Sequence, residues 1–194
     1  MQIIYFIDCK EYKMNNVGEI ENKFVLAPMT RCISKINGCP SKQLEDFYVD
    51  QVKNGITTII TESCAINGED ARGYLNGSQF FSDQHAKSWT PIINKIHKYG
   101  GKIFIQLFHA GRLTVKEVTN CSPISASPLK PREVPSFWRP LLDEELVHFQ
   151  TRTKFEKPKK MSLSKIKKII GQFRKSSELA KKAGFDGVEI HGAH

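Results

Sequence analysis

The chain has 194 residues, of which 40% are hydrophobic and 25% are charged. These proportions are typical of a folded globular protein and exclude a fibrous or low-complexity chain. No stretch approaches the roughly 20 apolar residues of a membrane helix, and the short apolar run at the N-terminus lacks a basic leader. Five cysteines without a Cys-x-x-Cys pair fit a reducing compartment, so we expect a cytoplasmic protein with no membrane partner.

The net charge of +9 is concentrated in one segment of the chain. Residues 151–182 contain twelve Lys or Arg residues and only two carboxylates, Glu156 and Glu178. A basic segment can neutralise nucleic-acid phosphates, but the aromatic residues of a base-stacking platform do not alternate with these charges. We interpret the segment as a loop and the solvated face of a helix, and we expect no nucleic-acid partner.

The expected elements alternate along the chain. Residues 1–23 have polar turns and predict a hairpin that leads into the first strand. Four runs rich in β-branched or aromatic residues predict buried strands at 24–29, 57–62, 102–108 and 187–191. Helices are predicted at 41–54, 82–99 and 162–183, because each begins at a serine that can act as N-cap and ends before a glycine.

Two further segments carry specific expectations. In the third helix, apolar residues recur at helical spacing and predict a face that packs on a sheet. They are Leu163, Ile166, Ile169, Ile170, Phe173, Leu179 and Ala180. Residues 110–161 hold six prolines and little periodicity, so we predict a long loop or lid after the third strand.

Alternating strands and helices predict a parallel sheet, either open and doubly wound or closed as a (β/α)₈ barrel. An open dinucleotide-binding sheet should show G-x-G-x-x-G after its first strand, and Thr30 to Ser34 show no such motif. Polar residues follow the strand ends, where a barrel keeps its active site. They are Thr30, Glu62, Ser63, Gln106, His109, His191 and His194. Three histidines suggest a metal, but the first strand offers no further ligand, and we expect none.

Four motifs in order resemble the old yellow enzyme family. Residues 27–31 read APMTR, 61–62 read TE, 106–112 read QLFHAGR and 184–194 read GFDGVEIHGAH. The resemblance covers nearly the whole chain from about Tyr12. It implies a TIM (β/α)₈ barrel, here incomplete, with a bottom-capping hairpin at 1–23 and about the first four β/α units. The whole of 1–194 would be the N-terminal part of one oxidoreductase domain.

The resemblance also implies cofactors and site residues. FMN would lie against Ala27, Pro28, Met29 and Thr30, with the Thr30 hydroxyl bonded to the flavin carbonyl that tunes its reduction potential. Ser63 would present its backbone N–H, and Gln106 would pair with the pyrimidine edge, since an amide both donates and accepts.

His191 and His194 would be catalytic residues that hold the carbonyl oxygen of an α,β-unsaturated substrate, while NAD(P)H serves as reductant. Donors placed where negative charge develops lower the barrier most. The implied function is an FMN-dependent NAD(P)H oxidoreductase, an ene-reductase that reduces the C=C bond of small-molecule enones.

Some features depart from the family pattern. Phe108 stands where tryptophan is common, and Asn76-Gly77-Ser78 replaces an Ala-Pro-Gly near the substrate pocket. The proton-donating tyrosine and the later strands that grip the FMN phosphate would follow His194. We therefore expect a truncated chain with impaired or absent activity. The alternative is a non-catalytic half-barrel that binds a partner or forms a homo-oligomer to protect its open strand edges.

Overall fold

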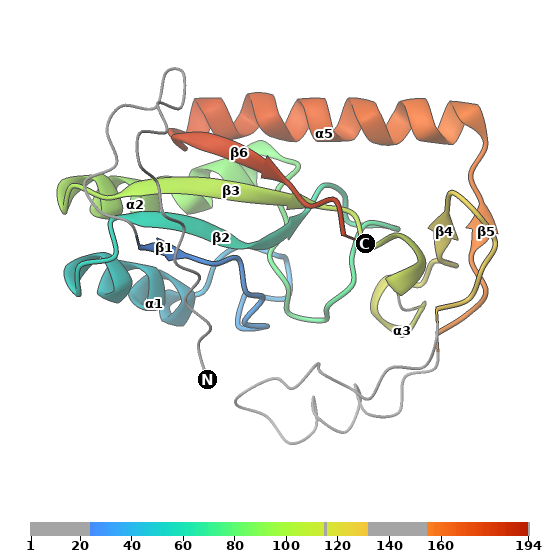
Figure 1. The fold of residues 1–194 in the computed structure, drawn as a ribbon, viewed down its shortest axis with the longest axis horizontal. Coiled ribbons are helices and arrows are strands. Elements are labelled where there is room, and N and C mark those ends of the chain that lie inside the picture. Colours follow the sequence, from blue (N-terminus) through green and yellow to red (C-terminus); the bar gives the residue numbers. More distant parts are fainter. Residues whose placement is uncertain (1–23, 115, 132–154, 194) are drawn as a thin grey trace.

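The computed structural model describes residues 24–114, 116–131 and 155–193, and these form a four-stranded sheet with helices along it and a separate two-stranded sheet (Figure 1). The strands of the larger sheet are β1 (Val25–Leu26), β2 (Thr58–Ala65), β3 (Lys102–Phe108) and β6 (Gly187–Ile190). They pair in the order β1-β2-β3-β6, and every pair is parallel. The predicted parallel sheet is confirmed, whereas the predicted hairpin at 1–23 lies outside the described residues.

The three predicted helices are present at nearly the predicted positions. They are α1 (Lys42–Lys53), α2 (Asp83–Lys98) and α5 (Leu163–Ala183). The hydroxyls of Ser41, Ser82 and Ser162 each accept a hydrogen bond from a first-turn N–H, which confirms them as N-caps. Gly184 ends α5 at φ +99°, a left-handed conformation that suits a residue without a Cβ.

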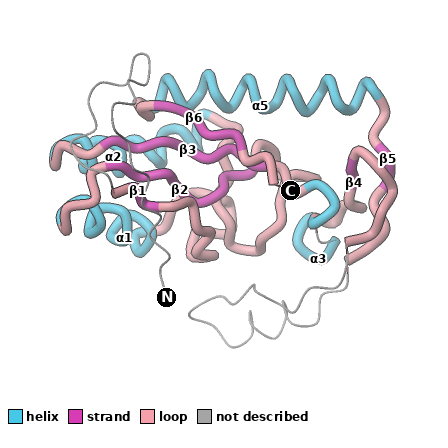
Figure 2. Tube along the Cα trace, viewed as in Figure 1, coloured by secondary structure: helices cyan, strands magenta, loops and turns pink. Residues whose placement is uncertain are grey.

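The core lies between the helices and the outer face of the sheet. Ile103, Ile105 and Leu107 of β3 are fully buried there, as are Ile93 and Trp89 of α2. Burial of such a side chain contributes about 1.5–3 kcal/mol. Figure 2 shows the strands running together in one layer, with helices placed between successive strands of the chain. This apolar layer holds the strand ends at fixed positions.

The strand boundaries differ from the prediction in β1 and β2. β1 ends at Leu26 rather than at residue 29, because Pro28 has no N–H to give to a ladder. β2 continues to Ala65 and contains an irregularity between Ile60 and Ser63. Ile60 pairs with Phe104 and Ser63 pairs with Gln106, so β2 has one more residue than β3 across this stretch. This β-bulge changes which side chains of β2 face each side of the sheet.

The prediction that the whole apolar face of α5 packs on the sheet is wrong at two positions of its first half, although Ile169 and Phe173 there do pack against the core. Leu179 and Ala180 are buried, but Leu163 is 79% exposed and Ile170 is 62% exposed. Figure 1 shows the reason, since the first half of α5 extends beyond the ends of β3 and β6. Most of the α5 lysines are exposed, as the solvated-face interpretation predicts.

The segment predicted as a long loop or lid contains short elements where it is described. These are a 3₁₀ turn at Gly111–Leu113, α3 (Lys116–Thr119), β4 (Ile124–Ser125) and β5 (Lys159–Lys160). β4 and β5 pair in parallel, so residues 124–125 lie beside the C-terminal end of this segment. Its role as a lid stays a prediction.

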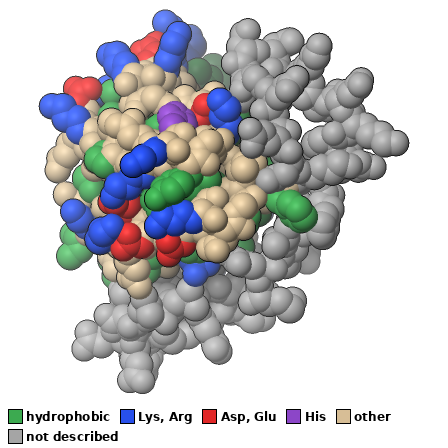
Figure 3. Space-filling model, turned by 90° about the vertical axis from the view of Figure 1, so that its left-hand side faces the viewer, with side chains coloured by type: hydrophobic (Ala, Val, Ile, Leu, Met, Phe, Trp, Pro, Cys, Tyr) green, Lys and Arg blue, Asp and Glu red, His purple; other side chains and the backbone are tan. Residues whose placement is uncertain are grey.

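The amino ends of the strands carry charged groups of both signs, as the space-filling view of that end shows (Figure 3). There the Asp186 carboxylate lies 2.8 Å from Nε2 of His97 and 3.4 Å from Nζ of Lys102, and it accepts a hydrogen bond from the Ile103 N–H. Within the described ranges, no helix is both long enough and apolar enough to cross a membrane.

Candidate functional site

Polar side chains form a row across the sheet near the carboxyl ends of its strands. Ser63 of β2 pairs with Gln106 of β3, and Gln106 pairs with Glu189 of β6. Thr30, in the loop after β1, joins the row because its Oγ1 lies 2.8 Å from Oγ of Ser63. Three of the six predicted cofactor-binding residues are thus brought together, Ser63 and Gln106 by the strand register and Thr30 by its contact with Ser63.

The remaining cofactor-binding candidates, Ala27, Pro28 and Met29, occupy the non-strand stretch between β1 and Thr30. The side chain of Met29 is 44% exposed. That this stretch lies against a planar ring stays a prediction.

A buried carboxylate fixes the loop that carries Thr30. Oε2 of Glu62 accepts a hydrogen bond from the Arg31 N–H at 2.8 Å. Its Oε1 accepts from the Ser78 hydroxyl at 2.6 Å and from the Ser78 N–H at 3.3 Å. The Ser34 hydroxyl bonds Ser78 at 2.7 Å and approaches Glu62 at 3.4 Å. Glu62 therefore ties β2 to the loops that begin after β1 and after β2.

The surroundings of Glu62 are strongly desolvated. Its side chain is fully buried, and burial raises the pKa of the carboxyl although several hydrogen bonds oppose the change. Its backbone N–H donates to the Tyr48 hydroxyl of α1 at 2.7 Å. The Asn76 to Ser78 stretch, which departs from the family pattern, supplies part of this network, since Asn76 also accepts from the Ser34 N–H at 3.1 Å.

Glu189 is a member of the polar row that sequence reasoning missed. Its Oε1 accepts a hydrogen bond from Nε2 of Gln106 at 2.6 Å. The available signal was alternation in β6, because residues two apart in a strand share a face and Glu189 is two residues before His191.

His191 continues the line of β6 beyond its last paired residue. Its N–H donates to the Leu107 carbonyl at 2.9 Å, and its ring centroid lies 5.4 Å from that of Phe108. Burial lowers the pKa of His191, with Glu189 acting in the opposite direction, so the imidazole is mainly neutral near pH 7. His194, the second predicted catalytic residue, lies outside the described residues.

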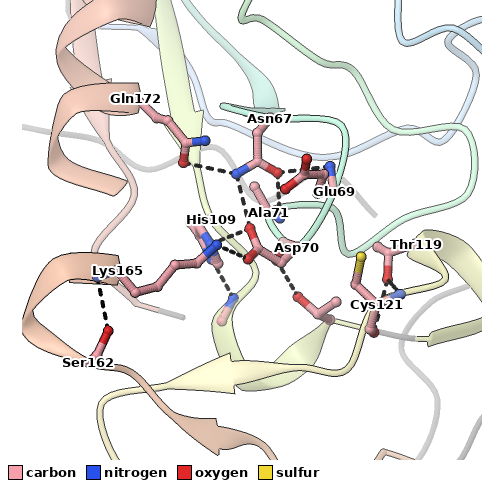
Figure 4. A network of polar contacts seen from close by, with 12 residues as sticks. Asn67, Glu69, Asp70, Ala71, His109, Thr119, Cys121, Ser162, Lys165 and Gln172 are labelled. Carbon is pink, nitrogen blue, oxygen red and sulfur yellow. Dashed lines mark hydrogen bonds and ion pairs between the residues drawn. The ribbon is translucent and has the colours of Figure 1, made fainter. Parts of the chain in front are cut away.

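His109 does not join the row but enters a separate network (Figure 4). Its Nδ1 accepts from the Gly111 N–H at 3.0 Å, which leaves the proton of a neutral ring on Nε2, 3.4 Å from Asp70. Lys165 of α5 pairs with the other oxygen of Asp70, and Asn67 donates to Asp70 at 3.1 Å. Burial opposes ionisation, but these partners hold the pKa of Asp70 well below its usual range.

This network joins the loop after β2 to the first half of α5. Asn67 also donates to Gln172 at 3.0 Å and accepts from two backbone N–H groups of its own loop. His109 thus contacts Gly111 through a hydrogen bond and Asp70 through a charge contact, whereas its Nε2 has no hydrogen-bond partner among the described residues. Across the part of the chain that the structure describes, no group of three His, Cys, Asp or Glu residues could hold a metal ion.

Parallel strands separated by helices, with a polar row at their carboxyl ends, define part of an α/β barrel of the enzyme type. Residues 12–194 match the model of the NADH:flavin oxidoreductase / NADH oxidase family. The chain belongs to this family, which confirms the resemblance to the old yellow enzymes and the oxidoreductase class.

Individual relatives agree with this assignment. A putative 12-oxophytodienoate reductase 2 from Oryza sativa subsp. japonica is 30% identical over 183 residues, which cover 94% of this chain and 44% of that protein. The old yellow enzyme homologue of Zymomonas mobilis superposes with a TM-score of 0.71 at 26% identity, over 86% of this chain and 43% of that one. Morphinone reductase gives 0.75 at 25% identity, over 92% and 46%.

The chain thus spans less than half the length of the relatives that it matches. These neighbours confirm the incomplete TIM barrel as the fold class, because the four described parallel strands correspond to part of their barrel. The family description names NADH and flavin, in agreement with the predicted flavin cofactor and nicotinamide reductant.

Proposed function

We propose that this chain contributes the flavin-facing part of an FMN-dependent NAD(P)H oxidoreductase that reduces the C=C bond of α,β-unsaturated carbonyl compounds. The observation that carries the proposal is the row formed by Thr30, Ser63 and Gln106. It presents hydroxyl, peptide and amide groups side by side, and these suit a planar heterocycle whose edge alternates carbonyl and N–H groups. FMN, when bound, supplies the hydride relay between NAD(P)H and the alkene.

The residues of the chain would hold the cofactor as follows. The stretch from Ala27 to Thr30 packs against the ring, and the Thr30 hydroxyl bonds a flavin carbonyl. The Ser63 N–H and the Gln106 amide bond the polar edge. The Glu62 carboxylate supports this arrangement because it fixes the Arg31 N–H, immediately after Thr30.

His191 and His194 would bind the substrate carbonyl. A neutral imidazole offers one N–H donor, and partial burial favours the neutral form of His191. Two such donors withdraw electron density from the alkene as hydride arrives at the β-carbon. The proposal that NAD(P)H is the reductant is supported by morphinone reductase, a structural neighbour solved in complex with tetrahydroNAD.

Binding of FMN to the purified 194-residue chain tests the proposal. Quenching of flavin fluorescence should report binding, whereas oxidation of NADPH that depends on added 2-cyclohexenone should be weak or absent, as the expectation of impaired activity requires. His191→Ala should abolish any residual turnover while the dissociation constant for FMN changes by less than about twofold. His97→Ala, at the opposite end of the strands, is the matched control and should alter neither. Failure of the unaltered chain to bind FMN would overturn the proposal.

A second candidate function, a self-associating half-barrel, is favoured by apolar groups on β6. Val188 is 36% exposed and Ile190 is 56% exposed, and the described strands pair with only one edge of β6. Unpaired strand edges and apolar side chains together favour association. Light scattering after size-exclusion chromatography should then show a dimer, whereas a monomer at high concentration would exclude this candidate. A cytoplasmic location stays a prediction.

A further inference from the structure

The hydrogen bond between Gln106 and Glu189 connects the two strands that carry the amide and the first histidine of the proposed site. Gln106 lies on β3 and is only 4% exposed, while Glu189 is its direct neighbour on the edge strand β6. Their side chains meet at 2.6 Å. The pair is therefore part of the sheet register and does not depend on a loop.

The Glu189 carboxylate determines the orientation of the Gln106 amide. An ionised carboxylate only accepts hydrogen bonds, so the amide atom that faces Glu189 has to be the nitrogen. One N–H of Gln106 is used in this contact. The amide oxygen and the second N–H then remain available on the polar row for a ligand.

We infer that Glu189 is a positioning residue that fixes the orientation of the Gln106 amide for the pyrimidine edge of FMN. The inference rests on the proposed function. In this orientation the amide oxygen can accept from the ring N3–H, while the free amide N–H can donate to the neighbouring carbonyl. A flipped amide would set two donors against each other, and one buried hydrogen bond of the complex would be lost.

The competing explanation is that Glu189 only ties the edge strand to the sheet. Both explanations predict that loss of Glu189 weakens FMN binding, but they differ in two respects. A positioning residue acts through Gln106 alone, so its effect should vanish when the amide is absent. A glutamine at position 189 should also restore binding, because its amide oxygen can still accept from Nε2 of Gln106.

The test is a double-mutant cycle on the full chain, with FMN as the probe and its dissociation constant as the measured quantity. Glu189→Leu should raise the dissociation constant about threefold to tenfold, the equivalent of one net hydrogen bond. Glu189→Gln should stay within about twofold of the unaltered chain. In a Gln106→Leu background, Glu189→Leu should have no further effect.

Ile190→Gln is the matched control, because it changes the next residue of β6, which lies on the opposite face of the strand, and it should leave FMN affinity unchanged. An equal loss from Glu189→Leu with and without Gln106 would overturn the inference, as would a Glu189→Gln variant no better than Glu189→Leu. Each of these results leaves the proposed function standing. If the unaltered chain fails to bind FMN, the proposed function and this inference fall together.

Discussion

Two regions of the molecule invert the usual relation between polarity and exposure. Around Glu62, polar groups are buried and satisfied by hydrogen bonds from Arg31 and Ser78. On the first half of α5 and the outer side of β6, large apolar side chains such as Ile170 and Ile190 are exposed. Buried polar groups and exposed apolar groups are the informative exceptions in a protein surface.

The two regions differ in whether their side chains have partners among the described residues. The Glu62 network closes within residues 31–78, so the loop that carries Thr30 is positioned by nearby sequence. The exposed groups of α5 and β6 contact no described element on their open side. The effect of substitutions on stability and on FMN binding can therefore be measured most directly at the proposed flavin-facing residues, whose supporting network is present in the described part of the chain.

The largest effect is expected from Glu62→Leu. The variant leaves the N–H groups of Arg31 and Ser78 buried without an acceptor, and each such group costs about 1–3 kcal/mol. The free energy of unfolding should fall by about 3–5 kcal/mol in urea denaturation. Glu69→Leu, at an exposed position, should change it by less than about 0.5 kcal/mol. If both variants lost the same free energy of unfolding, the hydrogen bonds of Glu62 would not contribute more to stability than an exposed side chain does.

A smaller effect should distinguish the two halves of α5. Leu179→Ala removes a side chain that is 6% exposed, and it should cost about 2–4 kcal/mol. Ile170→Ala, on the half that extends beyond the sheet, should cost less than about 0.5 kcal/mol. Thermal unfolding of both variants measures the difference. If Ile170→Ala proved as costly as Leu179→Ala, the side chain of Ile170 would have to be packed in solution.

The smallest effect, and one that depends on pH, is expected from Asp70→Asn. It should lower the free energy of unfolding by about 1–3 kcal/mol at neutral pH, since Lys165 and His109 lose their partner. The pKa of Asp70 is lowered in the folded state, so its contribution is complete above the ordinary carboxyl pKa of about 4 and is lost as pH falls through the folded pKa.

The difference in the free energy of unfolding between Asp70→Asn and the unaltered chain should therefore become smaller as the pH of the urea titration is lowered from about 5 to about 3. Asp46→Asn, whose carboxylate is exposed on α1, is the control and should differ from the unaltered chain by less than about 0.5 kcal/mol. If this difference for Asp70→Asn stayed constant with pH, the assignment of the Asp70 ion pairs would be wrong.

The sequence predicts the elements well where the signal is local. Ser41, Ser82 and Ser162 were recognisable as N-caps because a cap bonds a residue only three positions away. Gly187 to Ile190 were recognisable as a strand from residue type alone. The order of the strands followed from alternation with helices, which forces parallel pairing.

Features that depend on distant partners were not predictable in the same way. The bulge in β2 exists only relative to β3, and the exposed half of α5 depends on where the sheet ends. Periodicity identifies an apolar face but not the element that covers it. The pairing of Gln106 with Glu189 required the register between two strands that are about 80 residues apart.

The bulge at Thr61 and Glu62 reverses the alternation of side chains between the two faces of β2. Counted strictly by twos from Ile60, Glu62 would point into the barrel and Ser63 toward the helices. The extra residue reverses this, so the Ser63 hydroxyl lies on the inner face beside Thr30, and the Glu62 carboxyl accepts hydrogen bonds from the loops outside it. One inserted residue thus gives the proposed flavin surface a hydroxyl at the position where strict alternation would have placed the Glu62 carboxyl.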